Sequence, residues 1–127
     1  MKKSILFALI LAPTLTLFNL NLSEISRAIN KGDATALGKH FAAEVEISFF
    51  DEGGEYSKVA GIKAVKSFFV KQKPLSFVQV HQGKSKGSDA HYSIGNMETK
   101  DATFRVYIYL EKKAGTFKIK ELRFDKE

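Results

Sequence analysis

The stretch TFRVYIYLE, residues 103–111, decides the fold class, because its apolar and polar side chains alternate without a break. One face of an extended chain here carries only apolar side chains: Phe104, Val106, Ile108 and Leu110. Strict alternation of this kind is typical of a β-strand with one face on the core and the other toward solvent. We therefore expect an antiparallel sheet with one buried face.

Runs with the same period of two flank this stretch. They predict strands at residues 76–82, 91–98 and 116–124, with a break at Gly83 and a turn at residues 113–115. Because the connections are short, consecutive strands must pair antiparallel, as a four-stranded meander. His91 follows a polar turn and is expected to be solvated.

The amino-terminal half predicts three helices and a hairpin. Apolar residues at helical spacing indicate one helix that starts near Leu22 and another that starts at Val59. A third, short helix is expected to be capped by Asp33 and to carry Phe41 on its inward face. Between them, residues 45–50 alternate as a strand, and residues 51–54 predict a turn into a short return strand. This order predicts an α+β fold, with helices on one face of an antiparallel sheet.

The first twenty residues differ from the rest. Lys2 and Lys3 precede an uninterrupted apolar run at residues 5–12, and no further charge occurs before Glu24. A short basic start before such a run is typical of a secretory signal peptide. We expect residues 1–20 to be a cleaved signal, with an uncleaved anchor as the alternative, and residues 21–127 to form one exported domain. Pro13 and polar neighbours dilute the second half of the run, which disfavours the anchor and stable membrane insertion.

Composition excludes several classes of site. The 127 residues include no Cys, which excludes disulfides, thiolate zinc sites and a cysteine nucleophile. Without Lys2 and Lys3, 18 basic residues stand against 14 acidic ones, a net charge of +4. Only three of the basic residues are Arg, and the lysines are interleaved with acids, so nucleic acid is not an expected partner. No phosphate-binding glycine loop and no closely spaced histidine pair occurs, so we expect no cofactor and no metal.

Two amino-terminal helices, a hairpin, a third helix and a closing meander resemble the nuclear-transport-factor-2-like fold, which belongs to the cystatin-like α+β superfamily. Local segments are similar to a bacterial family known only as a domain of unknown function, number 4783. These segments are residues 23–29, 80–85, 104–110 and 121–124. The resemblance implies a curved sheet that wraps helices and encloses a pocket. It implies no particular reaction, because this fold carries isomerases, dehydratases, hydrolases and binding modules.

The second face of the 103–111 strand indicates a homodimer. Tyr and Arg are enriched where proteins meet, and many proteins of the resembled superfamily pair sheet against sheet. If the last strand also alternates strictly, its apolar residues share this face. The candidate interface residues are Arg105, Tyr107, Tyr109, Leu122 and Phe124. Cross-strand tyrosine pairs that only stabilise an exposed sheet are the alternative.

Glu121 is the best catalytic candidate. In strict alternation it points inward with Ile119, and burial raises the pKa of a carboxyl group, which suits a general acid or base. His81, which shares a strand phase with Phe77 and Gln79, is the candidate partner of Glu121. A β-bulge near Lys120 is the alternative, and it turns Glu121 outward and places Leu122 in the core.

No catalytic motif occurs in the chain, which has neither a nucleophile elbow nor a catalytic cysteine. We therefore expect a non-enzymatic module that binds a small apolar ligand in the pocket of a curved sheet, or a protein partner. One alternative is an isomerase, dehydratase or hydrolase that uses Glu121 and His81. A structural dimerisation module is the other.

Overall fold

The computed structural model describes residues 22–50, 52–84 and 89–127. This part of the chain forms three helices and a six-stranded sheet, which confirms the predicted α+β class. The expected signal peptide lies outside the described residues. In chain order the elements are the first helix (residues 22–31), α2 (Ala34–Gly38), β1 (Phe41–Phe49), β2 (Glu52–Ser57), α3 (Lys58–Lys71), β3 (Ser76–Lys84), β4 (Ala90–Glu98), β5 (Thr103–Lys113) and β6 (Thr116–Lys126).

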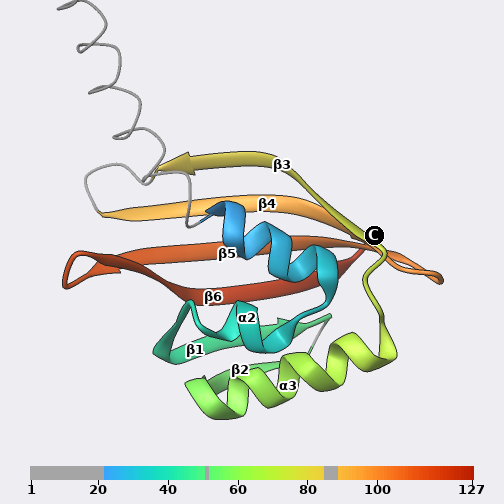
Figure 1. Ribbon diagram of the computed structural model, residues 1–127, viewed down its shortest axis with the longest axis horizontal. Coiled ribbons are helices and arrows are strands. Elements are labelled where there is room, and N and C mark those ends of the chain that lie inside the picture. Colours follow the sequence, from blue (N-terminus) through green and yellow to red (C-terminus); the bar gives the residue numbers. More distant parts are fainter. Residues whose placement is uncertain (1–21, 51, 85–88) are drawn as a thin grey trace, which may run out of the picture.

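The six strands lie in the order β2-β1-β6-β5-β4-β3, and the helices cover one face of the sheet (Figure 1). The predicted meander of β3, β4, β5 and β6 is confirmed, with antiparallel pairing throughout. β1 joins the meander by parallel pairing with β6, and β2 pairs antiparallel with β1 at the edge. The first and last strands of the described residues, β1 and β6, therefore lie side by side within the sheet.

Local signals set the helix boundaries. The first helix is followed by Gly32, whose φ of +67° is favoured by glycine. Asp33 caps α2 by accepting a hydrogen bond from the Ala36 backbone N–H at 3.0 Å. The expectation that Phe41 lies on this second helix is wrong, because Phe41 begins β1. The Ile119 backbone N–H donates to the His40 carbonyl at 2.6 Å, which already holds the chain in the sheet.

The turn between β1 and β2 comes earlier than the glycines suggest. Gly53 and Gly54 were expected in the turn, but both are strand residues that pair with Ser48 and Ile47 of β1. The chain reverses next to Phe50, which has a φ of +63°. At the other end of β2, the Ser57 side chain accepts a hydrogen bond from the Ala60 backbone N–H at 3.2 Å and caps α3.

The core lies between the helices and the inner face of the sheet. The four apolar side chains of β5 are at most 1% exposed, as their alternation predicts. Phe68 of α3 lies at the centre of an aromatic cluster, with ring centroids 4.9 Å from Phe49, 5.4 Å from Phe104 and 4.7 Å from Phe124. Aromatic side chains thus fill the space between α3 and the sheet.

Two bulges change which side chains face the core. In β6, Ile119 pairs with Leu110 and Glu121 pairs with Tyr109, so Lys120 is an extra residue. In β3, Val80 is the extra residue between Gln79 and His81. Each bulge shifts the alternation by one residue and flips every later side chain of its strand to the opposite face.

Candidate functional site

The outer face of the sheet, opposite the helices, carries a row of aromatic and cationic side chains across four strands. The His81 Nε2 atom of β3 lies 3.2 Å from the Tyr92 hydroxyl of β4. The ring of Tyr92 stacks on that of Tyr107 of β5, with centroids 6.4 Å apart. The guanidinium of Arg123 on β6 lies 6.0 Å from the Tyr107 ring centroid, within cation–π range. We call these four residues the outer row.

Aliphatic side chains extend the outer row toward the β3 edge. Ile94 pairs with His81 on one side and with Tyr107 on the other, and its side chain is half-buried. Val78 and Val80 of β3 are 59% and 52% exposed. Together with the outer row these residues make an apolar patch. It lies on the face of the sheet opposite the helices (Figure 1).

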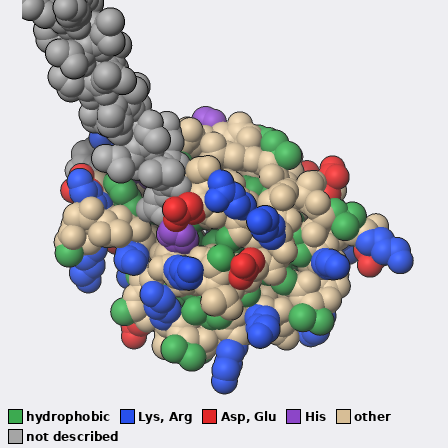
Figure 2. Space-filling model, viewed as in Figure 1, with side chains coloured by type: hydrophobic (Ala, Val, Ile, Leu, Met, Phe, Trp, Pro, Cys, Tyr) green, Lys and Arg blue, Asp and Glu red, His purple; other side chains and the backbone are tan. Residues whose placement is uncertain are grey.

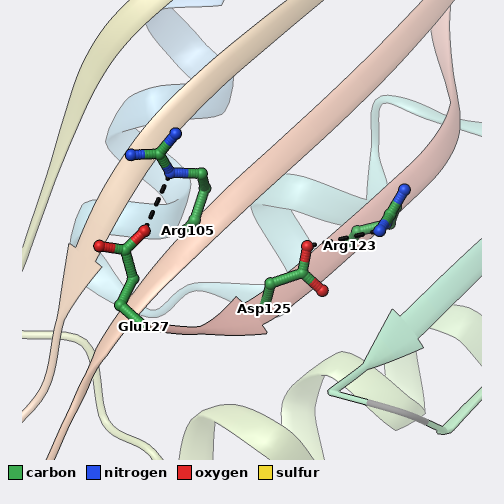
Figure 3. Close-up of polar contacts among 4 residues, drawn as sticks. All are labelled: Arg105, Arg123, Asp125 and Glu127. Atoms are coloured by element: carbon green, nitrogen blue, oxygen red, sulfur yellow. Dashed lines mark hydrogen bonds and ion pairs between the residues drawn. The ribbon is translucent and has the colours of Figure 1, made fainter.

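Charged side chains border the patch. Arg105 pairs with the Glu127 carboxylate at 3.0 Å, and Arg123 contacts Asp125 at 3.5 Å (Figure 3). On the same face, toward the β2 edge, Glu46 of β1 stands in register with Glu55 of β2 and with Glu121 of β6. Carboxylates that stand opposite each other on neighbouring strands repel, so a positively charged group from outside the row would stabilise these three glutamates.

Tyr107 and Tyr109 of the outer face stay protonated at neutral pH. Burial raises the pKa of the Tyr107 hydroxyl, and the nearby Glu121 carboxylate adds to this rise. Burial also raises the pKa of Tyr109, whose hydroxyl donates a 3.4 Å hydrogen bond to Glu111. Both phenols therefore offer an apolar ring and a hydrogen-bond donor, the combination that is common in protein interfaces.

The structure places Glu121 and His81 on the outer face and does not bring them together. Glu121 pairs with Tyr109 and points away from the core, as the bulge alternative predicts, and Leu122 is fully buried. Three strand spacings, about 14 Å, separate β6 from β3. An acid and a base that act on the same proton must lie within hydrogen-bonding reach of it, so these residues do not form such a pair.

Two of the five predicted interface residues are in the core. Arg105, Tyr107 and Tyr109 lie on the outer face, as expected. Leu122 and Phe124 are 0% exposed, and their expected position on the outer face is wrong. The extra residue Lys120 shifts the phase of β6, which turns both side chains inward.

The bulge in β3 and the inward phase of β4 explain two further errors. Phe77 and Gln79 were assigned to the phase of His81, but Phe77 is 7% exposed and Gln79 accepts a 2.7 Å hydrogen bond from the inward-facing Ser93 hydroxyl. His91 was expected to be solvated. It is 9% exposed, its ring packs edge-on against Phe117 at 4.9 Å, and burial lowers its pKa.

Sequence reasoning missed Tyr92, Ile94 and Val78 as members of the outer face. Their signal was indirect, because each is assigned only through its register with β5 or with a neighbouring strand. In the part of the chain that the structure describes, no group of three or more His, Asp or Glu side chains could hold a metal ion. Within the same residues, no helix is both long and apolar enough to cross a membrane.

The architecture of helices packed in a curved six-stranded sheet is that of the nuclear-transport-factor-2-like proteins. One such protein, from Shewanella baltica and of unknown function, has a TM-score of 0.64 at 13% identity, covering 84% of this chain and 87% of that chain. A de novo designed protein with a curved β-sheet has a TM-score of 0.65 at 20% identity, covering 84% of this chain and 97% of that one.

The family is more specific. Residues 22–125 match the family described as "Domain of unknown function (DUF4783)", and the chain belongs to this family. The crystal structure of a DUF4783 family protein from Bacteroides ovatus has a TM-score of 0.78 at 28% identity, covering 82% of this chain and 93% of that chain. The crystal structure of a DUF4783 family protein from Bacteroides uniformis has a TM-score of 0.78 at 25% identity, covering 83% of this chain and 95% of that chain. Comparison with the curated proteins found no match.

Proposed function

We propose that this domain is a non-enzymatic binding module that pairs with a second copy of itself through the outer face of its sheet. The observation that carries the proposal is the outer row, which runs without interruption across four strands beside two exposed valines. Aromatic rings bury large areas at low conformational cost, and the centres of interfaces are enriched in Tyr and Arg.

Charge complementarity supports a second copy as the occupant. On the outer face, Arg105 and Arg123 lie on β5 and β6, and the register row of Glu121, Glu46 and Glu55 extends from β6 to the β2 edge. A two-fold axis through the patch can place the glutamates of one copy against the arginines of the other, since the same surface is used twice. Such pairing would also relieve the repulsion within the glutamate row.

Two exposed valines give a matched test of the interface. Val78→Glu places a carboxylate in the patch, whereas Val70→Glu places one on the opposite side of the protein, on α3, where Val70 is 77% exposed. We expect light scattering with size-exclusion chromatography to give a dimer for the wild type and for Val70→Glu. Val78→Glu should be a monomer, with circular dichroism and melting temperature close to the wild type. A monomeric wild type at millimolar concentration would refute the dimer.

Export is the second part of the proposal. The basic start and the apolar run at residues 5–12 support a cleaved signal, and the helix that begins the folded domain starts just after this segment. Mass spectrometry of the protein from its native cell fractions should give a periplasmic or secreted chain that begins near residue 21. A cytoplasmic chain that retains residues 1–20 would contradict export.

A small apolar ligand is the second candidate function, and a hollow beside α3 favours it. The hollow has a volume of about 270 Å³ and includes Phe49, Phe50 and Phe68 in its lining; Phe50 is 43% exposed. Ala64 also lines it. Ala64→Trp should fill the hollow and abolish enhancement of an apolar fluorescent probe, whereas Ala60→Trp, which does not line it, should leave the fluorescence unchanged. Equal fluorescence in both variants would exclude this hollow.

A further inference from the structure

A second hollow lies where β1 separates from β6. It has a volume of about 640 Å³, which is within the range of small-molecule sites. Its apolar part consists of Phe41, Ala42 and Ala43 at the start of β1. Its charged lining residues come from β1, α3, β5 and β6: Glu44, Lys58, Glu111, Lys113, Lys118 and Lys120. We call this hollow the basic groove.

The basic groove results from an interruption of the sheet. The β1–β6 register passes from Phe41–Ile119 directly to Glu46–Glu121, so four residues of β1 stand opposite Lys120 alone. Glu44 and Val45 pair with β2, but Ala42 and Ala43 are in register with neither neighbouring strand. Their backbone amide groups border a gap between two strands, where ligands find hydrogen-bonding groups that a regular sheet would use internally.

Positive charge dominates the basic groove. Four lysines line it against two glutamates, and none of these lysines has an ion-pair partner within 4.0 Å among the described residues. Lys58 is also the first residue of α3, whose amino-terminal end carries a partial positive charge. Uncompensated ammonium groups around a concave surface focus a positive potential into it.

We propose that the basic groove binds a small polyanion, a molecule with two or more carboxylate or phosphate groups and an apolar side. The anionic groups contact the lysines, and the apolar side lies on Ala42 and Ala43, which are half-buried and exposed, respectively. A small molecule fits this site better than a nucleic acid polymer, because on the face that Figure 2 shows the positive side chains form no continuous stripe and acidic ones lie among them. A polymer site needs an extended basic stripe.

The test uses two anions and a matched pair of variants. Pyrophosphate and citrate are titrated into ¹⁵N-labelled protein at constant ionic strength, with sodium chloride as the reference salt. We expect saturable shifts in the amide signals of Ala42 and Ala43. Lys118→Gln combined with Lys120→Gln should weaken binding at least tenfold. Lys63→Gln combined with Lys66→Gln, which removes the same charge from α3 outside the groove, should leave the affinity unchanged.

The two anions also identify the preferred anionic group. Stronger binding of pyrophosphate supports the site and assigns phosphate to it, and stronger binding of citrate supports the site and assigns carboxylate. Lys113→Gln, at an exposed position of the β5–β6 hairpin, repeats the test without touching a half-buried side chain. The proposal is overturned if shifts spread over the whole lysine surface, if both double variants lose affinity equally, or if a single-stranded oligonucleotide binds more tightly than either small anion.

Discussion

At the scale of one residue, substitution of Leu122 tests whether its side chain lies in the core or on an interface. Its side chain is 0% exposed between the sheet and the helices. Leu122→Ala should therefore lower the free energy of unfolding by about 2–5 kcal/mol, the usual cost of removing a fully buried leucine side chain. Chemical denaturation followed by circular dichroism measures this loss.

Leu75 is the control for this substitution because it is the same residue type at 64% exposure. Leu75→Ala should change the free energy of unfolding by less than about 0.5 kcal/mol. If Leu122→Ala instead leaves unfolding unchanged and dissociates a dimer, Leu122 lies on an interface and the assignment of its face is wrong.

Two histidines, the buried His91 and the half-buried His40, make stability depend on pH. Burial lowers the pKa of His91, and the positive charge of Lys84 lowers it further. Burial also lowers the pKa of His40, and this effect is larger than the opposite effect of the Glu24 carboxylate. The folded state therefore prefers both rings neutral, while the unfolded chain takes up protons near its ordinary pKa of 6.5. Stability is full above that pH and falls as the pH drops below it toward the lowered values.

Urea unfolding at pH 7.5 and at pH 5.5 tests this linkage. We expect a smaller free energy of unfolding at pH 5.5, and His40→Gln combined with His91→Gln should flatten the difference. The double variant also loses packing, so the comparison concerns the slope with pH and not the absolute stability. An unchanged slope in the double variant would assign the pH dependence to the carboxylates.

At the scale of an element, alternation predicted each strand up to its bulge. The β5 side chains were assigned correctly along the whole strand, because β5 itself contains no extra residue: its register with β4 is unbroken, and the bulge opposite Tyr109 and Leu110 belongs to β6. In β6 the alternation was correct at Ile119 and wrong at Leu122. Lys120 has no local signal that marks it as an extra residue, and only the pairing with β5 fixes the bulge. The outer row was therefore predictable only in part.

The β5–β6 hairpin gives a test of backbone strain. Ala114 and Gly115 connect the strands with φ values of 54° and 83°, the pattern of a two-residue turn that asparagine and glycine favour. Gly115→Ala should cost about 1–2 kcal/mol, and Ala114→Asn should stabilise the protein by about 0.5–1 kcal/mol. Thermal and urea unfolding of each variant measure both changes.

Gly54→Ala is the matched control. A Cβ atom would meet no neighbour within 4 Å at either Gly54 or Gly115, but only Gly115 has a positive φ. Gly54→Ala should therefore be nearly neutral. If both substitutions lower the free energy of unfolding equally, the left-handed backbone conformation of Gly115 is not the cause of the loss.

At the scale of the whole molecule, the sequence predicted the meander but not how β1 and β2 join it to complete the sheet. Neighbouring strands with short connections must pair antiparallel, so β3 to β6 followed from spacing alone. The parallel pairing of β1 with β6 joins segments about 75 residues apart, for which no local pattern exists. The basic groove lies at that junction, and no reasoning from local periodicity could have placed Ala42 beside Lys120.

The order of the strands predicts a gradient of stability across the sheet. β5 lies between two partners and buries its inner side chains, whereas β2 pairs only with β1 and most of its residues are exposed. In native-state hydrogen exchange, central β5 amides should exchange only through global unfolding, and β2 amides bonded to β1 should exchange at least about a hundredfold faster through local opening.

The other edge strand provides the internal comparison for this gradient. The Phe77 backbone N–H of β3 donates to the Asn30 Oδ1 atom at 2.9 Å, which ties this edge to the first helix. Asn30→Ala should accelerate exchange at Phe77 and leave the β2 amides unchanged, because the lost hydrogen bond acts on β3 alone. β2 amides as slow as those of β5 would instead mean that the edge strand opens only when the whole domain unfolds.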